Sequence, residues 1–467
     1  MLQPLDPTAA AFLIAENRRM PMHLGGLQLF TKPDGAGPDF VHDLYAELRG
    51  SDDVAPLFRK HPVRSVRTGG QYVWREDDDF DIEYHVRHSA LPKPGRVREL
   101  LELCSRLHST RLATERPLWE WHLIEGLRDG RVAMYAKLHH ALVDGVSAMR
   151  LLQSVLTSDP HRTGMPAPWA SSPASATVKE ARENVVSLSD VRLQVMRTAL
   201  AINAEAAGLP GALIRTLRRS LRNETSPLAL FAPRTVLNQP ITSARRFAAR
   251  DWPIERLRNI GRATSTGVND VVLAMCSGAM RSYLRELDAL PDTSLISMVP
   301  VGLKAKESHL PSVHGGNALG SIMVRLGTDL PDPADRLAAI SASMIAGKRA
   351  LAEMTPVQVL AMSALGQAPA ILGPMLRLGG VVKPPYNLII SNVPGPRSTQ
   401  HFNGMRLVGT YPLSIPIDGM ALNITCNSYA GDMAFGLTGC RRTVPHLQRL
   451  LTHLDNELIA LEKAAAS

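Results

Sequence analysis

The sequence predicts an α/β fold of mixed α+β character, arranged as two lobes. Strand-like and helix-like segments alternate through the first half of the chain, a pattern typical of sheets covered by helices. A stretch rich in Pro, Ser and Ala follows at residues 165–177, and linkers have this composition. Mixed α/β patterning then returns, and 467 residues exceed what one core of roughly 150 residues needs. We therefore expect an N-terminal lobe over residues 1–178, a helical basic connector over 179–240 and a C-terminal lobe over 241–467.

Hydrophobic periodicity places the elements of the N-terminal lobe. Apolar residues that recur at intervals of three and four give residues 96–113 one apolar helical face. Residues 131–138 are expected to form a strand, whose side chains alternate between two faces. The lobe is therefore expected to contain strands at 23–30, 71–77 and 131–138 and helices at 39–50, 96–113 and 146–156.

The connector is basic, and the second half of the chain returns to mixed patterning. Residues 179–222 are helical in pattern and carry four arginines between positions 215 and 222. Two interpretations stay open for them: a solvated face on a connecting helix, or contact with an anionic lipid or cofactor. The C-terminal lobe is expected to contain a helix at 268–287 and strands at 294–301, 320–326, 386–396 and 421–429.

The composition describes a folded protein that favours anionic partners. Hydrophobic residues make up 45% and charged residues 20% of the chain, the ordinary globular range, and the formal net charge is +9. This charge favours nucleic acid, acidic lipid headgroups or a phosphorylated cofactor, but no aromatic and basic motif supports nucleic-acid binding. The cysteines form no CxxC pair, which argues against a zinc knuckle or a disulfide framework and fits a reducing cytosol. They are Cys104, Cys276, Cys426 and Cys440.

No segment predicts secretion or a membrane span. The N-terminus lacks a basic region followed by an apolar run, so we expect no signal peptide. The longest apolar stretch, residues 365–382, is interrupted by two prolines, a glutamine and an arginine. It is therefore a poor transmembrane helix, and we interpret it as an interfacial or channel-lining segment.

The segment HHALVDG, residues 139–145, carries the main candidate chemistry. The strand that begins at residue 131 is expected to continue through residue 140. Strand side chains alternate, so His139 and His140 are expected to point to opposite faces and not to converge on one metal ion. His140 shares the apolar face, where burial lowers the pKa of an imidazole and keeps it neutral, as a general base requires. A hydrogen-bonded core histidine is the alternative interpretation. His139 is expected to hold the end of the strand.

The end of the same segment predicts a turn into a helix. Asp144 is expected near the helix N-cap, and Gly145 is expected to supply backbone freedom. No GxSxG nucleophile elbow occurs in the chain, so a covalent serine mechanism has no candidate nucleophile. A base that activates the hydroxyl group of a substrate is the simpler chemistry.

HHALVDG matches the HHxxxDG signature of the acyltransferase superfamily that contains chloramphenicol acetyltransferase and the nonribosomal condensation domains. More specific motifs are PMHLGGLQLF near the N-terminus, PLWEWHLIEGL at 117–127, VNDVVLA at 268–274 and SNVPGP at 391–396. In this order, across nearly the whole chain, they resemble the bacterial wax ester synthase/acyl-CoA:diacylglycerol acyltransferase family. The resemblance implies two chloramphenicol acetyltransferase-like lobes of mixed sheet, with an active-site channel between them.

The resemblance also implies direct acyl transfer. His140 takes a proton from the hydroxyl of a fatty alcohol or diacylglycerol as this attacks the thioester of a fatty acyl-CoA, and the imidazolium then protonates the CoA thiolate. Acyl-CoA is a cosubstrate, and no permanently bound cofactor, metal or acyl-enzyme is expected. The oxyanion needs a donor, for which Asn269 is the first candidate, with a helix N-cap as the open alternative. Asp270 is expected to be structural.

The other motif residues are expected to support structure. By resemblance, Asp144 makes a structural ion pair with an arginine that the sequence does not identify. Pro117, Leu118 and Trp119 are interpreted as a packed entry to a strand, with contact between Trp119 and an acyl chain left open. Asn392, in SNVPGP, is either structural or lines the channel.

The implied substrates lead to the expected partners and location. Long acyl chains come from a lipid surface, so we expect a bacterial cytoplasmic protein that associates peripherally with the inner membrane or lipid inclusions. Segments 213–222 and 365–382 are the candidate contacts. The acceptor preference, the chain-length preference and the oligomeric state stay open. Two other functions also stay open: a carrier-dependent condensation-type acyltransferase and a non-catalytic protein that binds lipid droplets.

Overall fold

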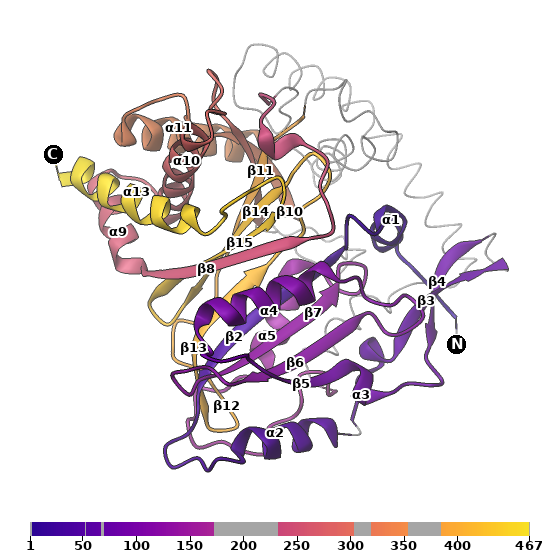
Figure 1. Cartoon of the computed structure of the whole chain (residues 1–467). Coiled ribbons are helices and arrows are strands. Elements are labelled where there is room, and N and C mark those ends of the chain that lie inside the picture. Colours follow the sequence, from indigo (N-terminus) through magenta and orange to yellow (C-terminus); the bar gives the residue numbers. More distant parts are fainter. Residues whose placement is uncertain are drawn as a thin grey trace.

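The computed structural model describes residues 2–51, 53–66, 70–171, 232–302, 319–353 and 384–466, which form two lobes side by side (Figure 1). Several sequence predictions lie outside the described residues: the linker beyond residue 171, the helical connector from 179 to 231 with its basic segment 213–222, and the apolar segment 365–382. In the described part of the chain, no helix is long and apolar enough to cross a membrane.

The first lobe is built on a six-stranded mixed sheet with the strand order β12-β13-β2-β7-β6-β5. Its strands are β2 (His23–Thr31), β5 (Val86–Ala90), β6 (Trp119–Glu125), β7 (Val132–His139), β12 (His401–Phe402) and β13 (Met405–Leu413). Side chains alternate along β7 as predicted, because Met134 and Ala136 lie in one hydrophobic cluster and Ala133 and Tyr135 in another. The alternation gives the sheet two apolar faces, and both need covering.

Helices cover both faces of this sheet. They are α2 (Phe40–Arg49), α3 (Ile82–His85), α4 (Val97–Ser109) and α5 (Gly145–Ser154). The apolar spacing of α4 directs Leu100 and Cys104 against Tyr135 on one face. On the other face, Val41 of α2 and Leu152 of α5 join the cluster that contains Phe30.

The second lobe is built on another six-stranded mixed sheet, with the order β10-β9-β11-β14-β15-β8. Its strands are β8 (Arg245–Pro253), β9 (Ile296–Gly302), β10 (Leu319–Arg325), β11 (Leu388–Val393), β14 (Leu422–Tyr429) and β15 (Asp432–Cys440). Its helices are α9 (Ile254–Ala263), α10 (Val268–Glu286), α11 (Pro333–Ala352) and α13 (Arg449–Ala466). The run from Val271 to Cys276 in α10 is fully buried, as expected for a helix that is apolar on all sides.

A smaller sheet and the first helix lie at the edge of the first lobe. The sheet has the order β1-β4-β3, with β1 (Gln3–Pro4), β3 (Lys60–Ser65) and β4 (Gln71–Glu76). Helix α1 (Pro7–Ala15) follows β1, and the Asp6 side chain caps it by accepting the Ala9 N–H at 2.9 Å. Short 3-10 turns occur at Pro56–Phe58 and Val236–Asn238.

Two strands from the C-terminal half of the sequence complete the sheet of the first lobe. β12 and β13 belong to the C-terminal half of the sequence, yet β13 pairs with β2 of the first lobe. The predicted division of the chain at residue 241 therefore does not follow the sheets, because residues 401–413 complete the N-terminal one. β13 also packs against β15 of the second sheet, and a Cβ on Gly436 of β15 would lie 2.0 Å from the Pro412 carbonyl oxygen. The missing side chain lets the two sheets approach.

We expect Gly436→Ala to lower the free energy of unfolding by about 1–3 kcal/mol, because overpacking forces well-packed backbones apart. Chemical denaturation measures this change. Gly37→Ala is the matched control, since an added Cβ there meets nothing within 4 Å. Equal stability of the Gly436→Ala variant and the wild type would contradict the proposed contact between the sheets.

Candidate active site

The end of β7 positions the histidine pair. The His139 N–H donates to the Leu118 carbonyl oxygen at 3.0 Å, and the His140 N–H donates to the Met22 carbonyl oxygen at 2.8 Å. β7 ends at His139, so His140 is the first residue of a turn and not the last residue of the strand. This corrects the prediction that His140 continues the apolar strand face, because its orientation comes from the turn and from Met22.

His139 is a fully buried anchor. Its Nδ1 accepts the Ala141 N–H at 3.0 Å, so the ring proton of a neutral His139 lies on Nε2. His139 Nε2 lies 3.6 Å from Glu16 Oε1. The imidazole therefore ties the residue after His140 to a buried carboxylate, which agrees with the predicted role of holding the strand end.

Glu16 completes this anchor. Its side chain is 2% exposed, and Oε1 also accepts the Met22 N–H at 3.0 Å while Oε2 lies 3.3 Å from the Arg111 guanidinium. Burial by itself raises the pKa of this carboxyl, but His139, Met22 and Arg111 together hold it below its usual value. The group is therefore an ionised carboxylate with three partners.

His140 itself is half-buried and packs against an aromatic ring. The Phe12 and His140 rings are stacked, with centroids 4.0 Å apart and planes 19° apart. Burial lowers the pKa of His140 to about 4, and the Asp144 carboxylate partly opposes this shift. The imidazole is therefore neutral near pH 7 and able to accept a proton, while Asp144 favours the imidazolium that such a transfer creates.

Asp144 caps helix α5, as predicted. Its Oδ1 accepts the N–H groups of Val146 and Ser147, each at 2.9 Å, and its Oδ2 accepts the Ser147 hydroxyl at 2.8 Å. No cation among the described residues pairs with Asp144, so the ion pair implied by the resemblance is not found there. Gly145 is the first residue of α5 and does not adopt a positive φ. The prediction that this position requires the backbone freedom of glycine is therefore wrong.

The PLW motif is part of the first core. Leu118 and Trp119 are at most 1% exposed, and Pro117 is buried beside them. Trp119 donates its indole N–H to the Phe58 carbonyl oxygen at 2.8 Å and stacks on His85 with ring centroids 4.5 Å apart. The motif therefore supports the strand entry next to His139, while an acyl-chain contact for Trp119 has no support in this buried cluster.

The ND and SNVPGP motifs come together in the second lobe. Asn392 Nδ2 donates to Asn269 Oδ1 at 3.5 Å, a long hydrogen bond between two half-buried side chains. Helix α10 has Gly267 as its N-cap and Asn269 as its second residue, so the N-cap interpretation of Asn269 is wrong. The Asp270 carboxylate turns back to the Gly267 N–H at 3.2 Å and is structural, as predicted.

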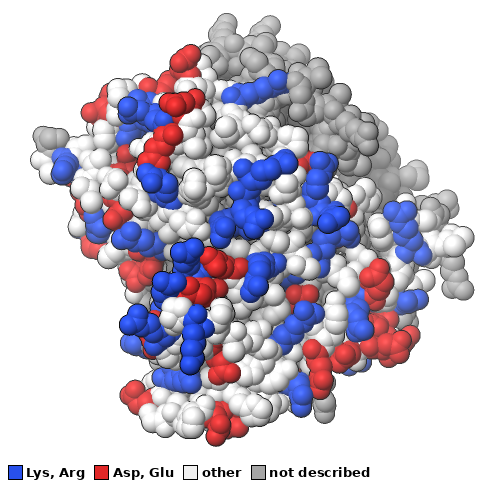
Figure 2. All heavy atoms as spheres, viewed as in Figure 1, with Lys and Arg blue, Asp and Glu red and all other residues white. Residues whose placement is uncertain are grey.

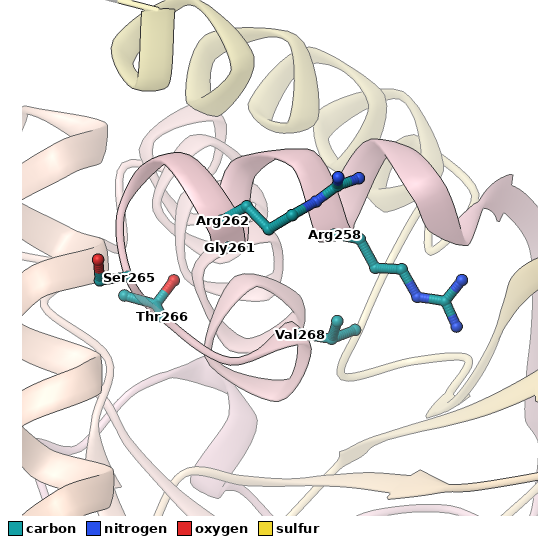
Figure 3. A pocket seen from close by; sticks show the side chains of 6 residues that line it. All are labelled: Arg258, Gly261, Arg262, Ser265, Thr266 and Val268. Atoms are coloured by element: carbon teal, nitrogen blue, oxygen red, sulfur yellow. The ribbon is translucent and has the colours of Figure 1, made fainter.

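A hollow of about 330 Å³ lies beside the start of α10 (Figure 3). Arg258 and Arg262 extend from α9 along it, and Val268 lines it from α10. Both guanidinium groups contact Glu255, Arg258 at 3.4 Å. Their charge is therefore partly balanced on α9 itself.

Metal binding has no candidate cluster within the described ranges. No group of three His, Cys, Asp or Glu side chains is arranged there to hold an ion. His139 and His140 differ in surroundings, one facing Glu16 and the other Phe12. His139 is therefore the anchoring histidine, and His140 is the candidate general base.

Two residues of the site were missed from the sequence. Phe12 and Glu16 lie on or just after the apolar segment PTAAAFLIA, which predicted no element. The one sequence signal that could have indicated this site was Glu16, a single acidic residue between the apolar segment PTAAAFLIA and the strand that begins in PMHLGG. Their distance from His140 in the sequence hid their contact with the pair.

The fold defines the class of protein. The first condensation domain of the CDA synthetase superposes with a TM-score of 0.56 at 17% identity, over 100% of this chain and 97% of that one. At this identity the likeness concerns the fold alone. With the HHxxxDG loop between strand and helix, the chain is a two-lobed, chloramphenicol acetyltransferase-like protein.

The family follows from closer matches. The model of the wax ester synthase/diacylglycerol acyltransferase catalytic domain matches residues 5–272, and that of the WS/DGAT C-terminal domain matches residues 315–462. The wax ester synthase/diacylglycerol acyltransferase from Marinobacter aquaeolei VT8 has a TM-score of 0.76 and 38% identity over 100% of both chains. A Mycobacterium tuberculosis H37Rv protein named as a probable diacylglycerol O-acyltransferase, tgs2, is 47% identical over 458 residues, 98% of each chain. The chain belongs to the wax ester synthase/diacylglycerol acyltransferase family and is an acyltransferase.

We expect Glu16→Gln to lower kcat about tenfold and Glu16→Ala about 10²-fold, with KM for both substrates nearly unchanged, because small displacements of catalytic groups have effects of this size. Steady-state kinetics of acyl transfer separate kcat from KM. Glu115→Gln, at an exposed site, is the control. A wild-type kcat in folded Glu16→Ala would contradict the anchoring role.

The pH dependence tests the state of His140. A base must be neutral to act, so kcat/KM should stay level from pH 8 to about pH 5 and fall as the pH drops through about 4. Asp144→Asn keeps a cap but removes the charge that raises the pKa of His140, so the acidic limb should move to lower pH. Circular dichroism at each pH separates unfolding from titration. A limb near 6.5 that Asp144→Asn leaves in place would contradict this assignment.

Proposed function

We propose that this protein transfers a long-chain acyl group from acyl-CoA to the hydroxyl of a fatty alcohol or a diacylglycerol, with His140 as the general base. The observation that carries this proposal is the neutral, half-buried imidazole of His140, stacked on Phe12 beside a fully buried partner histidine. The named activities of the relatives supply the substrate classes.

The transfer needs no covalent enzyme intermediate. His140 accepts the hydroxyl proton while the hydroxyl oxygen forms a bond to the thioester carbonyl carbon. As the intermediate collapses, the carbon–sulfur bond breaks and the imidazolium gives its proton to the CoA thiolate. The products are an ester and free CoA, and His140 returns to its neutral state.

The oxyanion of this intermediate needs a preorganised donor, for which we propose the side-chain amide of Asn269. Asn392 donates to Asn269 Oδ1, which leaves the Asn269 NH₂ group free to face a substrate oxygen. Because Gly267 and Asp270 already serve the start of α10, Asn269 has no capping duty that would compete with this role.

The wider setting is part of the proposal. We place the acyl-CoA and acceptor in a channel between an N-terminal and a C-terminal lobe, joined by a connector near residues 179–240. A bacterial cytoplasmic enzyme with these lipid substrates would work at the inner membrane or at lipid inclusions. The carrier-dependent and non-catalytic alternatives are disfavoured, because a relative named as a diacylglycerol O-acyltransferase matches 98% of the chain.

The test is release of free CoA from palmitoyl-CoA with hexadecanol, dipalmitoylglycerol or no acceptor, with the lipid products resolved. We expect release to depend on the acceptor, with ester formed, and His140→Ala to lower the rate at least ~10²-fold. His161→Ala, at an exposed site, is the matched control. Folded wild-type protein that forms no ester with either acceptor would overturn the proposal.

A further inference from the structure

Exposed arginines from both halves of the chain lie on segments that meet at the surface. Blue side chains dominate the middle of the face in Figure 2, where in Figure 1 the end of α4 lies beside the start of β8. The exposed arginines of the segments that meet here are called the arginine patch. Its members are Arg18, Arg19, Arg111, Arg441 and Arg442.

Hydrogen bonds hold these segments around one buried residue, Arg245. The Arg245 guanidinium donates to the Arg19 carbonyl oxygen at 2.8 Å, and its N–H donates to Ser109 Oγ at 2.8 Å. Next to it, the Arg441 N–H donates to the Ala244 carbonyl oxygen at 2.9 Å. The turn after α1, the end of α4 and the turn after β15 therefore meet at this point.

The patch carries more positive charge than its partners balance. Among the described residues, two patch arginines pair with carboxylates: Arg19 with Asp418 at 3.4 Å and Arg111 with Glu16 at 3.3 Å. Both carboxylates are at most 10% exposed, whereas both arginine side chains are at least 41% exposed. Solvent therefore meets guanidinium groups, which suit phosphate because their planar donors match its oxygens.

The patch is connected to the proposed base by a short chain of contacts. Arg111 contacts Glu16, Glu16 accepts the Met22 N–H, and the Met22 carbonyl oxygen accepts the His140 N–H. The turn that holds Arg18 and Arg19 lies between Glu16 and Met22. An anion on the patch would therefore lie at the surface, linked through Arg111, Glu16 and Met22 to His140.

We propose that the arginine patch binds the nucleotide phosphates of the acyl-CoA cosubstrate, an inference that rests on the proposed function. CoA carries a 3′-phosphate and a diphosphate at the end of a pantetheine arm, so its highly charged end must remain outside a buried site while its thioester enters. The patch offers that end unbalanced arginines, one of which is linked to His140 through Glu16 and Met22. Arg258 and Arg262, which line the hollow beside α10 (Figure 3), differ from the patch because both contact one exposed carboxylate, Glu255.

The test compares two thioesters that differ in the phosphates. Initial rates are measured with palmitoyl-CoA and with S-palmitoyl-pantetheine, using hexadecanol as acceptor. The test variant is the double substitution Arg18→Gln/Arg441→Gln, which leaves Arg111 and its contact with Glu16 intact. The matched control is Arg258→Gln/Arg262→Gln. Circular dichroism and thermal melting establish that each variant is folded.

We expect the patch variant to raise KM for palmitoyl-CoA about fivefold to tenfold, the effect of losing two exposed charge interactions, and to leave KM for S-palmitoyl-pantetheine unchanged. Added salt should raise the wild-type KM for palmitoyl-CoA more than that of the variant, because salt screens exposed charges. The control variant should match the wild type with both thioesters.

Three other results would contradict the inference, and each points to a different cause. An unchanged KM for palmitoyl-CoA in the patch variant, or equal changes for both thioesters, removes the patch as a phosphate site. A rise confined to palmitoyl-CoA in the control variant moves the site to the hollow beside α10. Wild-type protein that transfers from neither thioester rejects the proposed function itself, which is a distinguishable failure.

An anionic lipid headgroup presents the same phosphate chemistry. Co-sedimentation with vesicles of phosphatidylglycerol and phosphatidylcholine, compared with phosphatidylcholine alone, separates the two sources. We expect the patch variant to sediment like the wild type. Loss of sedimentation with an unchanged KM for palmitoyl-CoA would assign the patch to the lipid surface and overturn the inference.

Discussion

The buried carboxylate of Glu16 is the constraint on which the geometry of the histidine pair depends. An ionised carboxylate inside a protein is costly unless charged or hydrogen-bonding partners surround it. Glu16 satisfies this condition with the Met22 N–H, the Arg111 guanidinium and the His139 ring. Those partners come from three separate parts of the first lobe. The entry to β2, the segment after α4 and the end of β7 must therefore meet at Glu16 in a fixed arrangement.

This arrangement gives two adjacent histidines different duties. His139 is fully buried, with Nδ1 accepting the Ala141 N–H and Nε2 directed to Glu16, so neither nitrogen is available to a substrate. His140 lies one residue beyond the strand, where Phe12 stacks on its ring and no hydrogen bond between described residues engages its side chain. Its ring is therefore oriented by packing while its nitrogens stay available, which suits a general base better than a fully satisfied core histidine.

Local patterns in the sequence explain how far the fold and site were predictable. Alternation along 131–138 and helical spacing in 96–113 gave β7 and α4, and Asp144 before an apolar run gave the cap of α5. Such signals depend on neighbours in the chain. The contacts of Glu16 and Phe12 with the histidine pair join residues more than a hundred positions apart in the sequence. The hydrogen bond between Asn269 and Asn392 likewise joins two distant motifs that no local periodicity connects. The strand end was placed one residue too late, because alternation alone does not show that β7 stops at His139.

Contacts between residues far apart in the sequence also hold the two lobes together. β13 pairs with β2 in the first sheet and packs on β15 of the second, so the sheet that ends at His139 and the sheet that contains Asn392 are held against each other. His108 adds a second tie through Ser414, which follows β13 and whose hydroxyl bonds to the Thr425 hydroxyl of β14 at 2.6 Å. His108 Nε2 donates to the Ser414 carbonyl oxygen at 3.0 Å, which leaves Nδ1 to accept the Tyr135 hydroxyl at 2.9 Å. Burial lowers the pKa of His108 to about 3, so this imidazole is neutral near pH 7. Because Tyr135 lies on β7, a movement of the second lobe away from the first would disturb the strand that carries His139. The geometry of the proposed acyl-transfer site therefore depends on contacts between the lobes as much as on the HHxxxDG loop itself.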